Sequence, residues 1–209
     1  MEAILTKPDD AAFRRKVLAL DETHHPKVAS LAKWTERWIK AAATNERGTK
    51  TRWMLFSGRS GTGKTHATKA AHKFLRGAAM ALWPRWYQGP PAMRYVIWSK
   101  AVALERYGWE DLEDEIRHCA MVFVDDLGAE IDRYRTGEPA ERLRLFLDLC
   151  RGKWLLMSTN VARHDFAKTF DSRVQSRLEM AACLDLSDVP DFRPRLVEGA
   201  GKQETTSNV

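Results

Sequence analysis

Short apolar runs alternate with amphipathic segments along most of the chain. The runs are rich in β-branched, aromatic and other large apolar side chains, and most of them stop at a glycine, an acidic residue or a small polar residue. This pattern is typical of strands that are buried on both faces of a parallel sheet. The predicted strands are 52–57, 94–98, 120–126, 154–160 and 182–186.

The segments between these runs carry apolar residues at helical spacing. In 27–43, for example, Val28, Leu31 and Trp38 share one face. Gly108 predicts a hinge between two short helical pieces. The other predicted helices are 10–20, 64–82, 100–107, 111–118, 138–150 and 165–180.

Strands that alternate with helices predict an α/β fold, in which helices cover both faces of a mainly parallel sheet. The length of 209 residues fits one such domain. We place it at 26–195, after a short N-terminal extension (1–25) and before a polar, glycine-rich tail (196–209) that we expect to be flexible. Phe13, Val17 and Leu20 in the extension are expected either to dock in a partner's groove or to pack on this protein's own core.

Composition and charge narrow the class of protein. Hydrophobic residues make up 44% and charged residues 30%, as in ordinary globular proteins. No apolar run is long enough to cross a bilayer, and the N-terminus shows no secretory signal. Three cysteines without a CxxC pair favour reduced thiols and a cytoplasmic location. The net charge of +6 is compatible with nucleic acid as a partner.

A glycine-rich loop follows the first predicted strand and opens a helix, which is the context of a Walker A phosphate-binding loop. Its backbone amides would face the phosphates, and the following helix would point its positive end at them. Lys64 would reach the β- and γ-phosphates, and the Thr65 hydroxyl would ligate Mg²⁺. The loop therefore predicts ATP and Mg²⁺ as cofactors. It consists of Gly58, Arg59, Ser60, Gly61, Thr62, Gly63, Lys64 and Thr65.

Two acidic residues end the third predicted strand, as in a Walker B motif. Asp125 is expected to hold the metal, and Asp126 to orient or polarise the attacking water. The shorter Asp126 stands where related ATPases often have Glu, which leaves the rate of hydrolysis open. Asn160, at the end of the fourth strand, is a candidate hydrogen-bond donor to the water or to the γ-phosphate. Because parallel strands end at one edge of a sheet, we expect these groups and the Walker loop to form one site.

Other side chains give weaker signals. Arg173 and Arg177 lie four residues apart, so both should project from one helix face, either as a solvated basic face or toward the γ-phosphate on a neighbouring subunit. Another candidate is an aromatic loop on which nucleic-acid bases could stack. It contains Trp83, Trp86 and Tyr87.

Four motifs occur in one order, and together they resemble the AAA+ ATPases of the DnaC/DnaI helicase-loader group, which includes the IstB-like transposition ATPases. The resemblance covers about 27–195, and the compact size suits a phage or mobile-element version. The motifs are the Walker A loop ending in Gly-Lys-Thr-His, Val-Asp-Asp-Leu-Gly (124–128), Ser-Thr-Asn (158–160) and Ser-Arg-Val-Gln-Ser-Arg-Leu (172–178).

The resemblance implies a P-loop NTPase fold with a five-stranded sheet in the order 5-1-4-3-2 and no C-terminal lid domain. It also implies that Asn160 is sensor 1 and Arg177 the arginine finger, with Arg173 beside it. Helical pieces at 100–118 would match the extra insertion of initiators and loaders. In this chain the insertion is acidic and would repel DNA, so Arg133 and Arg135 are better DNA candidates. Arg193 is a candidate substitute for a sensor 2 arginine.

The leading hypothesis is therefore an ATPase that loads the replicative helicase, with single-stranded DNA as a further partner, no membrane partner, and self-association in the ATP state. An IstB-type ATPase that remodels DNA and recruits a transposase is the second hypothesis. A third is an ATP-binding switch with little turnover. A small-molecule kinase is disfavoured, because the chain shows no recognisable acceptor or lid segment.

Overall fold

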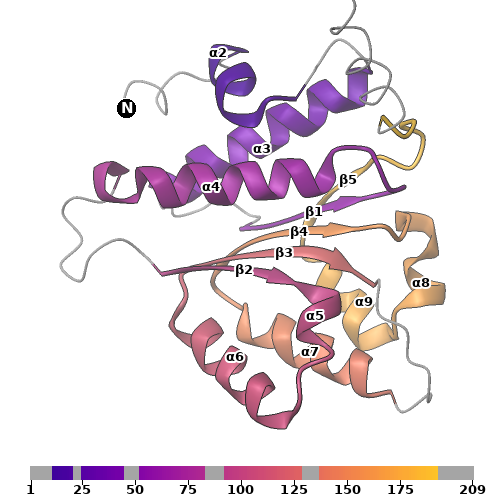
Figure 1. Cartoon of the computed structure of the whole chain (residues 1–209). Helices are drawn as coiled ribbons and strands as arrows, with labels where there is room; N and C mark the ends of the chain where they lie inside the picture. Colours follow the sequence, from indigo (N-terminus) through magenta and orange to yellow (C-terminus); the bar gives the residue numbers. More distant parts are fainter. Residues whose placement is uncertain (1–10, 21–24, 45–51, 83–91, 129–136, 193–209) are drawn as a thin grey trace, which may run out of the picture.

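A five-stranded parallel sheet forms the centre of the molecule (Figure 1), in a computed structural model that describes residues 11–20, 25–44, 52–82, 92–128 and 137–192. The strand order is β2-β3-β4-β1-β5. Read from the other edge it is 5-1-4-3-2, so the expected topology is confirmed. The strands are β1 (Trp53–Ser57), β2 (Met93–Ile97), β3 (Met121–Leu127), β4 (Trp154–Thr159) and β5 (Ala182–Asp185).

Helices cover both faces of this sheet (Figure 1). The helices of one layer precede β2 in the chain: α2 (Ala11–Phe13), the π-helical turn η1 (Arg14–Leu18), α3 (Pro26–Thr44) and α4 (Lys64–Leu82). Those of the other layer follow β2: α5 (Trp98–Ala101), α6 (Arg106–His118), α7 (Glu138–Leu149), the 3₁₀ turn η2 (Arg163–Asp165), α8 (Phe166–Thr169) and α9 (Ser172–Leu178).

The central strands are apolar on both sides because each side meets its own hydrophobic cluster. Along β3, Phe123 packs in the cluster under α3 and α4, whereas Val122 and Val124 pack in the cluster under α6 and α7. Trp38 of α3 contacts the ring of Phe123 edge-on, at a centroid distance of 5.5 Å. Side chains alternate across a strand, so two buried faces require a continuous apolar run.

Residues 11–20 of the N-terminal extension pack on the protein's own core, which is one of the two alternatives that the sequence left open. Phe13 is buried and contacts the ring of Phe74 at 5.1 Å. Val17 and Leu20 are partly buried against the same cluster. A buried ion pair, Arg14 Nη1 to Glu36 Oε2 at 2.9 Å, also fixes the segment to α3.

Three local predictions were wrong. Gly108 lies inside α6 rather than at a hinge, and the preceding helix is only the turn α5. The predicted helix at 165–180 is interrupted, because Phe170 has extended dihedrals and Asp171 caps α9 by accepting a 2.8 Å hydrogen bond from the backbone N–H of Val174. Finally, the acidic pair does not end the third strand, since β3 continues to Leu127.

All three cysteines are free thiols, as the sequence indicated, and Cys119 and Cys150 are buried. In the part of the chain that the structure describes, no helix combines the length and apolar character needed to span a membrane. The described ranges do not include the aromatic loop or the arginines proposed for DNA and for sensor 2. These side chains are Trp83, Trp86, Tyr87, Arg133, Arg135 and Arg193.

Candidate nucleotide-binding site

The glycine-rich loop joins the end of β1 to the start of α4, the position that the sequence predicted for it. Gly58, Gly61 and Gly63 have φ angles of 122°, 79° and 91°, a region of backbone space that L-residues with a side chain rarely adopt. A Cβ atom on Gly58 would also lie 2.5 Å from the carbonyl carbon of Leu186. The loop conformation therefore depends on glycine.

Lys64 lies at the first turn of α4, and its side chain turns back over the loop. Its ammonium donates hydrogen bonds to the carbonyl oxygens of Gly58 at 2.7 Å and Arg59 at 2.5 Å. Lys64 is only 4% exposed, and Thr62 is buried beside it, while Arg59 and Ser60 are exposed on the outside of the loop. A positive charge is therefore held at the mouth of the loop, where a phosphate would meet it.

The Asp125 carboxylate is the centre of a hydrogen-bond network that joins four elements. Oδ1 accepts from the Thr65 hydroxyl of α4 at 2.9 Å and from the Ser158 hydroxyl of β4 at 2.5 Å. Oδ2 accepts from the Tyr95 hydroxyl of β2 at 3.0 Å. Asp125 is 6% exposed, so these donors compensate for the burial of its charge.

A β-bulge gives the two adjacent acids different surroundings. The pairing of β3 with β4 shifts between Val124 and Leu127, and Asp126 has a φ of 67°. In a regular strand, neighbouring side chains point to opposite faces. The Asp126 side chain does not join the network around Asp125: its Oδ1 instead accepts a 2.5 Å hydrogen bond from Asn160 Nδ2, just after the end of β4. The left-handed conformation of a non-glycine residue is strained, and such strain is often found at functional sites.

Burial and the nearby Asp125 carboxylate raise the pKa of Asp126 above the ordinary value of an aspartate, and Lys64 acts in the opposite direction. Burial, with a smaller contribution from Asp125, also raises the pKa of the Tyr95 hydroxyl. Tyr95 therefore stays protonated and can donate to Asp125. Asp126 is more basic than a surface aspartate, which suits a group that accepts a proton from water.

The two arginines of α9 differ, although their spacing places both on one helix face. Arg177 turns onto α7, where Nε and Nη2 donate to Asp148 Oδ1 and Oδ2 at 2.9 and 2.7 Å. Its side chain is 16% exposed. The side chain of Arg173 is 64% exposed, with Asp171 at 3.4 Å and Glu141 at 3.8 Å. Within one chain neither arginine enters the network around Asp125.

The segment that follows β5 lies against the glycine-rich loop. The Leu186 N–H donates to the Ser57 carbonyl at 2.8 Å, and the Phe192 N–H donates to the Gly61 carbonyl at 3.2 Å. These hydrogen bonds support the conformation of the loop. Up to residue 192, no helical lid domain follows β5 in the described chain.

ATP and Mg²⁺ fit the donor set of this site. The loop offers a glycine-dependent backbone cradle with a buried ammonium at its mouth, and α4 is long enough for its dipole to act on an anion. A hydroxyl and a carboxylate, Thr65 Oγ1 and Asp125 Oδ1, converge within 2.9 Å. Oxygen ligands of this kind are those that Mg²⁺ takes beside nucleotide phosphates.

The sequence did not identify three contributors to this arrangement. In the sequence, Ser158 stands out only as part of the Ser-Thr-Asn run. Tyr95 and Asp148 gave no signal, because only the strand register and the α7–α9 packing bring them to Asp125 and Arg177. Tyr95 lies three positions before the end of the predicted strand 94–98, which would have been a usable clue if the strand order had been known.

No protein-family model matches the sequence, and no curated protein matches it either. Several solved structures share its fold. AMPPCP-bound DnaA from Aquifex aeolicus has a TM-score of 0.57 at 13% identity, over 85% of this chain and 53% of that one. DnaI has a TM-score of 0.53 at 18% identity, over 81% of this chain and 92% of that one. A protein provisionally assigned as a primosome component from Streptococcus pyogenes serotype M3 has a TM-score of 0.55 at 14% identity. The match covers 88% of this chain and 94% of that one.

The fold is that of a P-loop NTPase with an AAA+ core. At these identities the likeness concerns the fold, and this chain spans about half the length of the DnaA structure. The particular function therefore has to be argued from the site.

Proposed function

We propose that this protein is an ATP-hydrolysing DNA-replication protein that loads a replicative helicase onto DNA, with ATP bound between subunits. The observation that carries the proposal is a cluster of polar side chains beside the glycine-rich loop, whose Gly58 carbonyl accepts a hydrogen bond from Lys64. The cluster consists of Thr65, Asp125, Asp126 and Asn160. The proposed metal ligands Thr65 and Asp125 and the proposed base Asp126 are the groups that phosphoryl transfer to water would require.

Each residue of the site has a separate proposed role. The loop from Gly58 to Gly63 and Lys64 would hold the phosphates, and Thr65 and Asp125 would hold Mg²⁺, which neutralises charge on the phosphate oxygens when bound. Asp126 would orient the attacking water and accept its proton. Asn160 donates to Asp126, so it would hold this carboxylate in place as well as face the γ-phosphate.

Arg177 would complete the site from a neighbouring subunit, with Arg173 beside it. A trans arginine stabilises the charge of the transition state and is worth several orders of magnitude in rate. This part of the proposal requires Arg177 to leave Asp148 when subunits assemble, because the pair holds it on its own α7.

Helicase loading rests on the ordered motifs and on the structural likeness to DnaI and to the primosome component. Pull-down of the replicative helicase from the same cell, with and without ATP, tests it. Binding in at least one state is expected, and an absence of binding in both would exclude loading.

Subunit complementation tests the shared site. Lys64→Ala should abolish ATP binding, and Arg177→Ala should keep ATP binding but lose hydrolysis. An equimolar mixture contains sites with an intact loop from one variant and an intact Arg177 from the other, so hydrolysis should partly return. A mixture that stays inactive would rule out ATP bound between subunits.

Two alternatives share this core. An IstB-type ATPase would instead bind a transposase and remodel DNA, and a pull-down with transposase as bait separates it from a loader. A switch with little turnover is motivated by Asp126, whose side chain is shorter than the Glu that related ATPases often have at this position. In a switch, Asp126→Asn would leave release of the partner unchanged, whereas a loader that depends on hydrolysis would retain its partner.

A further inference from the structure

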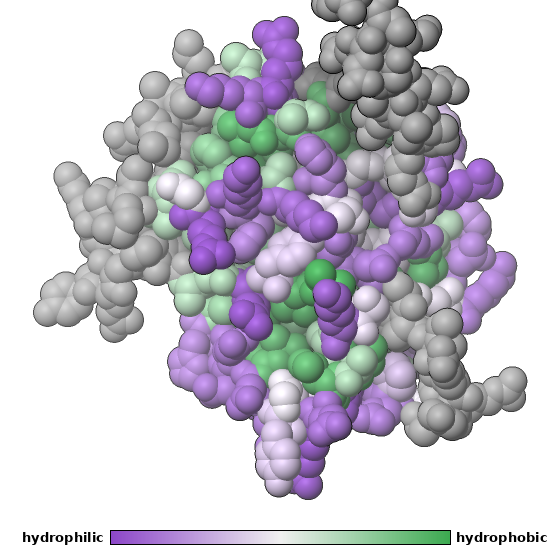
Figure 2. All heavy atoms as spheres, in the orientation of Figure 1, coloured by the Kyte–Doolittle hydropathy of each residue, from purple (hydrophilic) through white to green (hydrophobic). Residues whose placement is uncertain are grey.

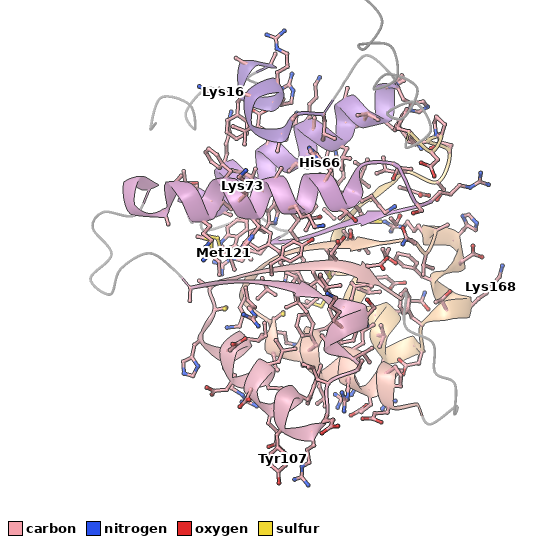
Figure 3. All side chains as sticks on the ribbon, in the orientation of Figure 1. Lys16, His66, Lys73, Tyr107, Met121 and Lys168 are labelled. Atoms are coloured by element: carbon pink, nitrogen blue, oxygen red, sulfur yellow. The ribbon has the colours of Figure 1, made fainter. Side chains whose placement is uncertain are left out.

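The outward side of α4 carries cations without the acids that accompany them elsewhere. Lys69, Lys73 and Arg76 are exposed and follow one another at intervals of four and three residues, so they form one stripe along the helix. The rise of 1.5 Å per residue spreads the stripe over about 10 Å. Figure 3 shows Lys73 on this side of α4, with His66 nearer the start of the helix.

The turn η1 extends the stripe sideways. Phe13 contacts Phe74 near the middle of α4, and the carbonyl of Leu18 lies 2.6 Å from Nε2 of His66 near its start. The segment between these two contacts therefore runs alongside the region from His66 to Phe74. It contains the exposed side chains of Arg15 and Lys16. We call the five cations the α4 basic face: Arg15, Lys16, Lys69, Lys73 and Arg76.

A comparison with α6 and α7 shows that this face is unusual within the protein. On those helices the cations are paired with acids one turn away, as in Arg106–Glu110 and Arg142–Glu138. By contrast, α2, η1, α3 and α4 together hold eleven Lys and Arg residues and one acid, Glu36, which is buried and paired with Arg14 and Lys40. Among the described residues, no acid pairs with any member of the α4 basic face.

Unpaired like charges at helical spacing repel one another and destabilise a helix. A surface with several unpaired cations is suited to bind a polyanion, whose negative charges would pair with them. The face also lacks the apolar anchors of protein interfaces: the large exposed apolar residues in the described chain are Leu104, Tyr107, Leu145 and Met180, all on other elements. Figure 2 shows mainly hydrophilic side chains across the middle of the view, where α4 lies.

We propose that the α4 basic face binds the phosphate backbone of DNA. The proposal rests on the proposed role in replication and places the DNA on the helix that begins with Lys64 and Thr65 of the nucleotide site. Contacts of this kind fix the position of the protein on DNA but carry no sequence information. The acidic α6, on the other layer of the sheet, would face away from the phosphates.

Salt dependence gives the first test, with the full chain and a fluorescent oligonucleotide offered as a single strand and as a duplex. Five phosphate contacts predict that log K falls with log salt with a slope of about −3.5 for a single strand and about −4.5 for a duplex. The two arms therefore also show which form of DNA is bound. Failure to bind either form at low salt would overturn the proposal.

A matched pair of triple variants locates the contact. The combination Lys69→Gln, Lys73→Gln and Arg76→Gln should weaken binding at least about a hundredfold near 0.1 M salt, and it should reduce the slope by about 2 for a single strand and about 2.7 for a duplex. The control replaces three cations outside the face: Arg106→Gln, Arg117→Gln and Lys168→Gln, whose side chains are 60–87% exposed. It removes the same net charge and should bind DNA like the wild type.

An equal loss of affinity in both triple variants would show attraction by net charge alone and overturn the proposal. So would a face variant that keeps DNA binding but loses self-association in sedimentation, since the face would then contact another copy of the chain. Binding of a fluorescent ATP analogue shows that each variant is folded. ATP hydrolysis is measured separately, so DNA binding at this face without hydrolysis would overturn the proposed function and leave this inference intact.

Discussion

Arg177 donates two hydrogen bonds to Asp148, from Nε at 2.9 Å and from Nη2 at 2.7 Å. The hydrogen bonds from Arg177 lower the pKa of Asp148, so the carboxylate stays charged at neutral pH. Arg144 and Arg151 contact the same carboxylate at 3.0 Å. The residue proposed to act on a neighbour's ATP is therefore held within its own subunit.

Release of Arg177 should therefore favour the assembled state. We predict that Asp148→Asn increases ATP hydrolysis about two- to fivefold at limiting protein concentration, since a partly exposed ion pair is worth about 0.5–1 kcal/mol. The rate is measured as a function of protein concentration. Arg144→Gln removes another partner of Asp148 and should have a smaller effect. A fall in rate for Asp148→Asn would instead mean that Asp148 positions Arg177 productively.

Asp126→Asn should stop hydrolysis and preserve nucleotide binding. Asparagine tolerates the left-handed backbone at this position, so the fold is kept while the proton acceptor is lost. The expected decrease in kcat is about 10²- to 10⁴-fold, the usual range for loss of a general base. Single-turnover hydrolysis and ATP-analogue binding measure the two quantities. Normal turnover in this variant would mean that a group other than Asp126 acts as the general base.

The same substitution should stabilise the protein near neutral pH. Burial and Asp125 raise the pKa of Asp126, so the folded state binds the proton more tightly than the unfolded state does. The ionised carboxylate therefore costs stability above its folded-state pKa, and this cost disappears as the pH falls through that value. Asp126→Asn should have a higher Tm than the wild type near neutral pH, with a difference that shrinks on acidification. A difference that grows on acidification would contradict the assigned shift.

Tyr95→Phe should weaken metal binding more than it slows the chemical step. The variant removes the hydrogen bond to Asp125 Oδ2 and keeps the ring against His72. Groups that orient a metal ligand typically contribute about tenfold to a hundredfold in metal affinity. The Mg²⁺ concentration for half-maximal ATPase activity should therefore rise about tenfold, with kcat at saturating Mg²⁺ near that of the wild type. An unchanged Mg²⁺ requirement would limit Tyr95 to a packing role.

Local patterns in the sequence were sufficient for the class of fold and for most of the site. Continuous apolar runs identified strands with two buried faces, and the strand–glycine loop–helix order located the loop around Lys64. Since parallel strands end at one edge, the sequence also predicted that Asp125, Asp126 and Asn160 would lie together. The strand order came from the resemblance of the motifs to a family, because hydrophobic periodicity does not say which strands are neighbours.

Only the tertiary structure decided how these groups meet. The bulge at Asp126 depends on the register between β3 and β4, and the contact of Tyr95 with Asp125 depends on the register between β2 and β3. The state of Arg177 depends on the packing of α9 on α7, which brings Asp148 close from 29 residues away. Register and helix packing arise from contacts between segments that are distant in the sequence, so local hydrophobic periodicity does not predict them.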